Sequence, residues 1–186
     1  MKTDKTQLLN QLIARVEQNI TDTQHLLTEP LDVLTARPRY GAWNVIEIIT
    51  HLNTYNNHYL PAIKVAINKG KRSNDLIYKS SWLGDYFVKM MEPVDGNISK
   101  KYKAAAKHKP ISQNNTVNVN KYILDQKILL DLLQRSANID LVDNKIPVSI
   151  APAIKLRLGD VYRFLIAHQQ RHFIQIANNL KLLVSA

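Results

Sequence analysis

The sequence predicts an all-α protein, a four-helix bundle, on three observations. Apolar residues recur at helical spacing in four long stretches of the chain. The chain holds only five glycines and has no clean run of alternating apolar and polar residues, which argues against a sheet protein. One long polar excursion separates the second stretch from the third, as in bundles with a crossover connection. With 186 residues, the chain is expected to form a single domain over residues 1-186.

The first helix is expected over residues 4–27, with Thr3 or Asp4 as its cap. Its apolar residues recur mostly every three or four positions, as on one face of a helix. Glu29-Pro30 should end it, because the residue before a proline is pushed out of the helical region.

The second helix follows a connector over residues 31–43. Asn44 is predicted to cap this helix, and Glu47, three residues later, completes the pattern of a capping box. Apolar residues at helical spacing continue from there, and the helix should stop at Gly70.

The stretch 71–119 is the least regular part of the sequence. Trp82 to Met91 is predicted to form a short amphipathic helix that Pro93 closes. The remainder is polar and rich in lysine. We expect this stretch either to cap the open end of a pocket in the bundle or to mediate a homodimer.

The third helix should start near Asn120 and end near Asn138. A second connector follows over residues 139–157, interrupted by two prolines. Within it, only Val148-Ser-Ile150 is expected to pair, weakly, as a strand.

The last helix carries the most informative residues of the chain. Gly159-Asp160 opens it, with Asp160 as the expected N-cap, and it runs to about Leu183. His168 and His172 lie four positions apart, so they share one face of the helix, where both rings can bind one metal ion. The alternative is a hydrogen-bonded histidine pair in the core, without a metal.

Two ligands rarely make a secure metal site, and His51 on the second helix is the best candidate for a third. If the second and last helices are neighbours, the three imidazoles converge inside the bundle, toward one end. Three neutral nitrogen ligands leave a divalent metal with an open coordination position. This ligand set does not choose among zinc, nickel, manganese, cobalt and iron.

Four further residues are candidates for a supporting role or for the pocket wall. Glu47 is explained by capping, and contact with His51 is its alternative role. His58 shares a helical face with His51 and would contact either substrate or a neighbouring helix. Gln175 would orient a ligand or a bound water, or pack between helices. Trp43 would hold the start of the second helix and could also wall the site.

Three other residues are given no site role. Arg171 points about 100° away from His172 around the helix. His25 and His108 belong to no motif and are expected at the surface.

The net charge of +10 is concentrated in the lysines of the middle stretch and is interpreted as a solvated basic surface. No nucleic-acid motif, phosphate-binding loop, dinucleotide fingerprint or serine nucleophile motif is present. The absence of cysteine excludes disulfides and thiolate metal sites. No apolar signal segment and no run near the ~20 apolar residues of a membrane span occurs, so a soluble, cytoplasmic protein is expected.

Two separate motifs together resemble the DinB/YfiT-like superfamily. They are Trp43-Asn44-x-x-Glu47-x-x-x-His51-Leu52 and, downstream of Gly159-Asp160, His168-x-x-x-His172-x-x-Gln175-Ile176. The resemblance implies an up-down-down-up four-helix bundle in which His51, His168 and His172 hold a divalent metal. It also implies a metal-dependent transferase, or an isomerase, that acts on a small molecule with a low-molecular-weight thiol such as bacillithiol or mycothiol.

Other functions stay open beside that one. A non-catalytic bundle that binds a metal or ligand, and a metal-dependent hydrolase, would need the same three histidines. Nucleic-acid association, prompted by the family's link to DNA damage, is a third class, although the sequence offers no motif for it.

Overall fold

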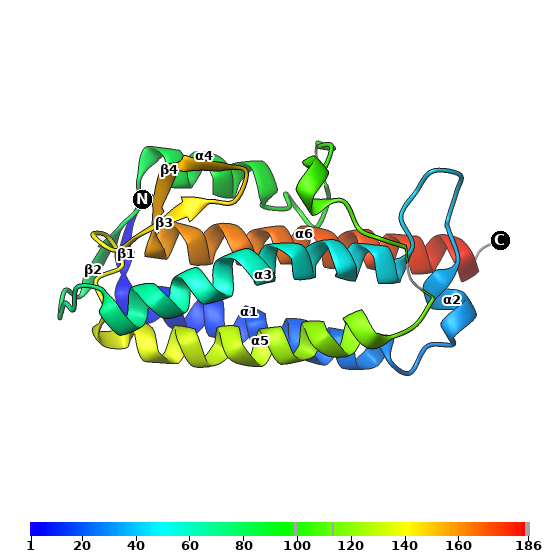
Figure 1. Ribbon diagram of the computed structural model, residues 1–186, viewed down its shortest axis with the longest axis horizontal. Helices are drawn as coiled ribbons and strands as arrows, with labels where there is room; N and C mark the ends of the chain where they lie inside the picture. The colour runs from blue at the N-terminus through cyan, green and yellow to red at the C-terminus, as the bar shows by residue number, and fades with distance from the viewer. Residues whose placement is uncertain (99, 113, 185–186) are drawn as a thin grey trace.

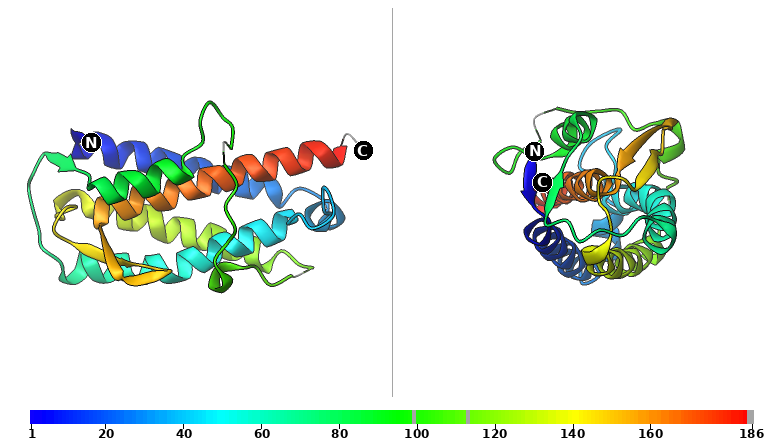
Figure 2. Two further views of the ribbon diagram at one scale, coloured as in Figure 1. Left: turned by 90° about the horizontal axis from the view of Figure 1, so that it is seen from above. Right: turned by 90° about the vertical axis from the view of Figure 1, so that its left-hand side faces the viewer.

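The computed structural model describes residues 1–98, 100–112 and 114–184, so positions 99 and 113 of the irregular middle stretch lie outside the described residues. It is mostly helical, with two small two-stranded sheets (Figure 1). Four long helices lie side by side: α1 (Lys5–Leu26), α3 (Val45–Lys69), α5 (Val117–Arg135) and α6 (Leu158–Val184). α1 and α3 each contact both α5 and α6. The end-on view in Figure 2 shows the four helices around a common core, and by the colour gradient of Figure 1 α1 and α6 run opposite to α3 and α5.

The starts of α1 and α3 are fixed by the predicted caps. The Asp4 side chain accepts a hydrogen bond of 2.8 Å from the backbone N–H of Gln7. Asn44 accepts one of 2.8 Å from the N–H of Glu47, and the Glu47 carboxylate accepts one of 3.0 Å from the N–H of Asn44. This reciprocal capping box satisfies two backbone donors that a helix start otherwise leaves without partners.

The prediction that Asp160 caps α6 is wrong. The helix begins at Leu158, and Asp160 lies inside its first turn. The fully buried Asp160 carboxylate instead accepts hydrogen bonds from the Ser81 N–H and hydroxyl, at 3.1 and 2.7 Å, and from the Tyr78 hydroxyl. The Asp160 side chain therefore hydrogen-bonds to Ser81 and Tyr78, which are distant in sequence, and does not cap its own helix.

The stretch between α3 and α5 is more ordered than its composition suggests. β2 (Ile77–Lys79) pairs antiparallel with β1 (Lys2–Asp4). α4 (Trp82–Met91) has the predicted bounds, is capped by Ser81 and packs on α6. The chain then crosses over α6 and reaches α3 at the short helix η1 (Ala106–His108), as Figure 2 shows.

Several short elements were not expected. The first connector contains α2 (Leu31–Thr35), and the second contains a hairpin of β3 (Lys145–Val148) and β4 (Ala151–Arg157). The strand predicted at Val148-Ser-Ile150 is wrong except at Val148, because Ser149 and Ile150 form the turn of this hairpin. η2 (Ser136–Asn138) extends the end of α5. Most of β4 is exposed, so β4 lacks the alternating pattern that identifies a half-buried strand.

The apolar core has two parts. The large apolar cluster joins the start of α1, the ends of α3 and α5 and the start of α6. The small apolar cluster joins the opposite ends of the same helices with α2, and its buried members are Leu26, Leu34, Val45, Ile46, Ile48, Ile49, Leu52, Val119, Tyr122 and Ile176. Within the described part of the chain, no helix combines the length and the apolar character that crossing a bilayer requires.

Candidate metal centre

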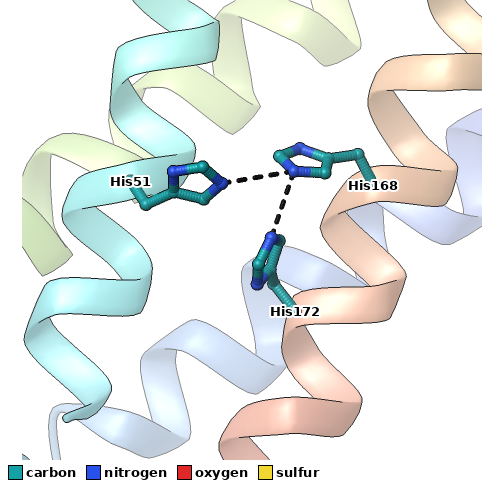
Figure 3. A group of neighbouring side chains, drawn as sticks. All are labelled: His51, His168 and His172. Carbon is teal, nitrogen blue, oxygen red and sulfur yellow. Dashed lines mark hydrogen bonds between the residues drawn. The ribbon is translucent and has the colours of Figure 1, made fainter. Parts of the chain in front are cut away.

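The three histidines singled out in the sequence meet inside the bundle. His51 comes from α3, and His168 and His172 come from neighbouring turns of α6 (Figure 3). All three side chains are buried. The Nε2 atom of His168 lies 3.3 Å from Nε2 of His51 and 3.1 Å from Nε2 of His172. One ring nitrogen from each residue lies within 4.8 Å of the other two, which is a group that could hold a metal ion.

Hydrogen bonds at the far side of two rings determine where their protons are. Nδ1 of His51 lies 2.6 Å from the backbone carbonyl oxygen of His108. A carbonyl oxygen only accepts, so this Nδ1 carries the proton and the neutral ring presents a lone pair at Nε2. Nδ1 of His172 lies 2.9 Å from Oε1 of Gln175, which assigns the same tautomer to that ring.

His168 cannot satisfy both neighbours. If its Nε2 carries the proton, the N–H can donate to His51 or to His172, and the buried Nδ1 lone pair has no hydrogen-bond partner among the described residues. If Nδ1 carries the proton, three lone pairs face one another. A cation is the one kind of group that accepts all three lone pairs at once, so the donor set fits a metal ion.

Burial keeps these rings neutral at pH 7. It lowers the pKa of His168 well below the usual range, and the neighbouring His172 and His51 lower it further. Burial also lowers the pKa of His172, to about 3, and that of His51, where the bond to the His108 carbonyl works in the opposite direction. Metal binding requires neutral imidazole. Because these rings are already neutral at pH 7, they lose no protons when a metal ion binds.

The spacing of the nitrogens also suits a small divalent ion. Nitrogen ligands at 2.0–2.1 Å from a tetrahedral zinc ion are separated from each other by roughly 3.3 Å. The two Nε2–Nε2 distances of 3.1 and 3.3 Å match that separation. The described residues place no carboxylate in the group, so its ligands are all neutral.

Aromatic rings surround the histidines. The Trp43 ring centroid lies 5.0 Å from that of His51, as expected for a residue that walls the site. Tyr55 lies 5.2 Å from His51 and 4.3 Å from His168, and Phe164 stacks on His168 at 6.0 Å. Tyr55 and Phe164 thus form an aromatic wall beside His168. Tyr55 and Phe164 were missed, although each lies four positions from a ligand candidate on the same helical face.

The expectation that His108 lies at the surface is wrong. Its side chain is buried, with Nδ1 2.8 Å from the Thr54 hydroxyl, Nε2 2.9 Å from the Ser149 hydroxyl, and the ring stacked on Tyr55 at 4.0 Å. Its carbonyl fixes the His51 tautomer. No local signal could have found it, because the crossing of the middle stretch over α3 brings it there. His25 is exposed, as expected.

Of the remaining candidates, Gln175 contacts a histidine of the group, whereas Glu47 and His58 have other partners. Glu47 completes the capping box and accepts from Arg37 at 2.5 Å. His58 points elsewhere, with Nε2 3.1 Å from the Pro147 carbonyl oxygen. Gln175 contacts His172 and holds its ring.

Arg171 was expected to have no place at the site, but it lines the cavity that His172 borders. Its guanidinium reaches over the ring of Tyr102, with Cζ 5.5 Å from the ring centroid. Arg171 lies on a different face of α6 from His168 and His172. The segment that crosses α6 between α4 and η1 packs over that face and brings Tyr102 to Arg171.

A mostly helical fold with a buried three-histidine group defines a class of protein: a helical bundle with a candidate metal centre between two of its helices. The sequence matches the DinB superfamily over residues 15–176. The chain therefore belongs to the DinB superfamily. Searches of curated proteins and of solved structures gave no significant match.

Proposed function

We propose that this protein binds one divalent metal ion through the Nε2 atoms of His51, His168 and His172, and transfers a low-molecular-weight thiol to a small electrophilic molecule. The observation that carries the proposal is the convergence of three Nε2 atoms that cannot all be satisfied by hydrogen bonds. Zinc, nickel and manganese are the candidate ions. The up-down-down-up bundle implied by the family resemblance would bring the ligands from α3 and α6 together.

The protein's own residues prepare this site in defined ways. The His108 carbonyl and Gln175 hold the rings of His51 and His172 with their lone pairs inward. Tyr55 packs against His51 and His168 inside the bundle, and Trp43 packs against His51 where the site meets the cavity. A metal ion held by three neutral imidazoles keeps its full charge and lowers the pKa of a water or thiol bound to it.

Two features of the chain favour an external thiol. The sequence has no cysteine, so the protein supplies no thiol nucleophile of its own. Glu47, the acidic residue of the first motif, is engaged by Asn44 and Arg37 and is not free to act as a base at the histidines. A thiol needs only a lowered pKa to become a nucleophile. We place the reaction in the cytoplasm, where such thiols are kept reduced.

The test is to load the protein with zinc, nickel or manganese and to follow consumption of 1-chloro-2,4-dinitrobenzene with and without cysteine or 2-mercaptoethanol. Rate enhancement should require both metal and thiol and should disappear in His172→Ala. The exposed His25 provides a matched control, because His25→Ala should keep full activity. Enhancement without thiol on an ester panel would favour a hydrolase, and no turnover with any metal would favour a binding protein.

A further inference from the structure

A cavity of about 970 Å³ opens beside the histidines. Three parts of the chain form its walls: the loop before α3 at residues 38–43, the crossing segment at residues 97–98 and 100–110, and the second half of α6. His172, Gln175 and Trp43 are among the lining residues, so the cavity borders the candidate metal centre. Its size suits a small organic molecule rather than a lone water or ion.

The charge of this cavity is one-sided. The described lining contains five cationic side chains and no aspartate or glutamate; the cations are Arg39, Lys101, Lys103, Lys109 and Arg171. Cations from all three walls thus face one concave space. Such an arrangement raises the local concentration of anions and favours their binding.

Arg171 is the informative member of this set. It is only 7 % exposed, and its guanidinium donates a hydrogen bond to the Lys100 carbonyl oxygen while it lies over the Tyr102 ring. In the part of the chain that the structure describes, no carboxylate lies within salt-bridge distance of it. A buried charge is costly unless an opposite charge or several hydrogen bonds compensate it, and a guanidinium has five donors to satisfy.

We propose that the cavity binds a small organic anion, whose carboxylate or phosphoryl group pairs with Arg171 while the rest of the molecule extends toward His172. Arginine suits this role because its planar donors match the oxygens of either group. The second half of this statement rests on the proposed function, since it names the substrate class of that site. The first half, an anion subsite at Arg171, stands on the cavity alone.

Trp43 provides a direct readout of binding. It lines the cavity, whereas Trp82, the second tryptophan of the chain, is 81 % exposed on α4 and lies outside the cavity lining. In a Trp82→Phe background the fluorescence therefore reports on the cavity. Two matched pairs of probes differ by one acid group: 3-mercaptopropionate against 3-mercaptopropionamide, and glycerol 3-phosphate against glycerol.

Titrations are carried out on the metal-free and on the zinc-loaded protein. At least one acid should bind with a Kd about tenfold or more below that of its neutral partner, because a hydrogen-bonded charge pair is lost in the neutral compound. The tighter acid shows whether a carboxylate or a phosphoryl group is preferred. Arg171→Met should raise that Kd at least about tenfold, Arg171→Lys should raise it less, and Lys127→Met, an equal loss of charge on the exposed side of α5, should not change it.

A second variant guards against misfolding, because Arg171 also tethers the crossing segment. Lys101→Gln/Lys103→Gln changes two exposed side chains and should raise the Kd severalfold with an unchanged thermal unfolding curve. Equal affinity for acid and neutral partner, or an unchanged Kd in both Arg171→Met and the double variant, would overturn the inference. If zinc binds with one ion per chain while the acids do not, only this inference fails. If the acids bind but no metal does, the proposed function fails and only the anion subsite at Arg171 remains.

Discussion

The two ends of the bundle core are both apolar, but the region between them is not. On α1, Val16 belongs to the large apolar cluster and Leu26 to the small one, and Asn19 and Thr23 lie buried between them. The same change from apolar to polar and back occurs on the other three long helices. The buried polar residues at this level, here called the polar layer, are Asn19, Thr23, Asn53, Asn56, Asp125, Gln126, His168, Gln169, Arg171 and His172.

The polar layer is only partly satisfied. Asn19 donates to Gln169 at 3.0 Å, and Gln169 donates to Asn56 at 3.4 Å. Among the residues that the structure describes, both amide atoms of Gln126 and Nδ1 of His168 have no hydrogen-bond partner. Buried polar groups without partners cost free energy, and a protein selected only for stability would replace them. The contrast teaches that the large apolar cluster holds the bundle together, while the polar layer gives up stability where the candidate metal centre lies.

The largest change in the free energy of unfolding should follow from truncating a side chain in the large apolar cluster. Leu165 on α6 is fully buried there. Leu165→Ala should lower the free energy of unfolding by ~2–5 kcal/mol, because it removes buried surface and leaves a cavity. Urea unfolding followed by circular dichroism measures it. The exposed Leu124 on α5 is the matched control, where Leu124→Ala should change stability by less than about 0.5 kcal/mol. Equal effects at the two positions would contradict the assigned role of the cluster.

Acid should lower the stability of the protein through the buried histidines of the candidate metal centre. The native pKa of His172 is lowered by burial to about 3, whereas in the unfolded chain it lies near 6.5. The unfolded state therefore binds more protons between these values, and the stability present above pH 6.5 is lost as pH falls toward 3. For the metal-free protein this loss should be on the order of 2 kcal/mol between pH 7 and pH 5. Urea titrations at the two pH values test it. His172→Asn should reduce the dependence without abolishing it, because burial also lowers the pKa values of His51 and His168. A wild-type protein equally stable at both pH values would refute the prediction.

The smallest expected change is a gain in stability rather than a loss. Gln126 is completely buried, and neither of its amide atoms has a partner in the described structure. Gln126→Met keeps a similar volume and removes the unsatisfied groups, so it should raise stability by about 1 kcal/mol. Gln169→Met is the matched comparison, and it should lower stability by a similar amount because Gln169 hydrogen-bonds Asn19 and Asn56. If both substitutions destabilise equally, the polar layer is satisfied in a way that these contacts do not capture.

Local signals explain which parts of the fold the sequence predicts. Asp4 and the pair Asn44–Glu47 act within one helical turn, and both caps are present as expected. Asp160 has the same kind of local signal, but Ser81 and Tyr78 compete for its carboxylate through the tertiary structure. Of the β3–β4 hairpin only a weak strand at Val148-Ser-Ile150 was predicted, because the pairing depends on contacts between strands rather than on an apolar pattern.

The same distinction holds at the candidate metal centre. The spacing of His168 and His172 and the position of His51 are visible in the sequence, and the structure brings these residues together. His108 and Arg171 reach the site through the crossing segment, which packs against α3 and α6 without any periodic signal. The sequence thus predicts which residues share one face of a helix. It does not predict which residues an irregular segment brings to that helix.

The central claim is that the Nε2 atoms of His51, His168 and His172 bind one divalent metal ion. Its most direct test is metal content, measured by elemental analysis of protein purified without added metal and by calorimetric titration of the stripped protein with zinc, nickel and manganese. We predict one divalent ion per chain in the wild type and in His25→Ala, and a sharp loss in His51→Ala and in the His168→Ala/His172→Ala double variant. A double variant that keeps full stoichiometric metal would contradict the account.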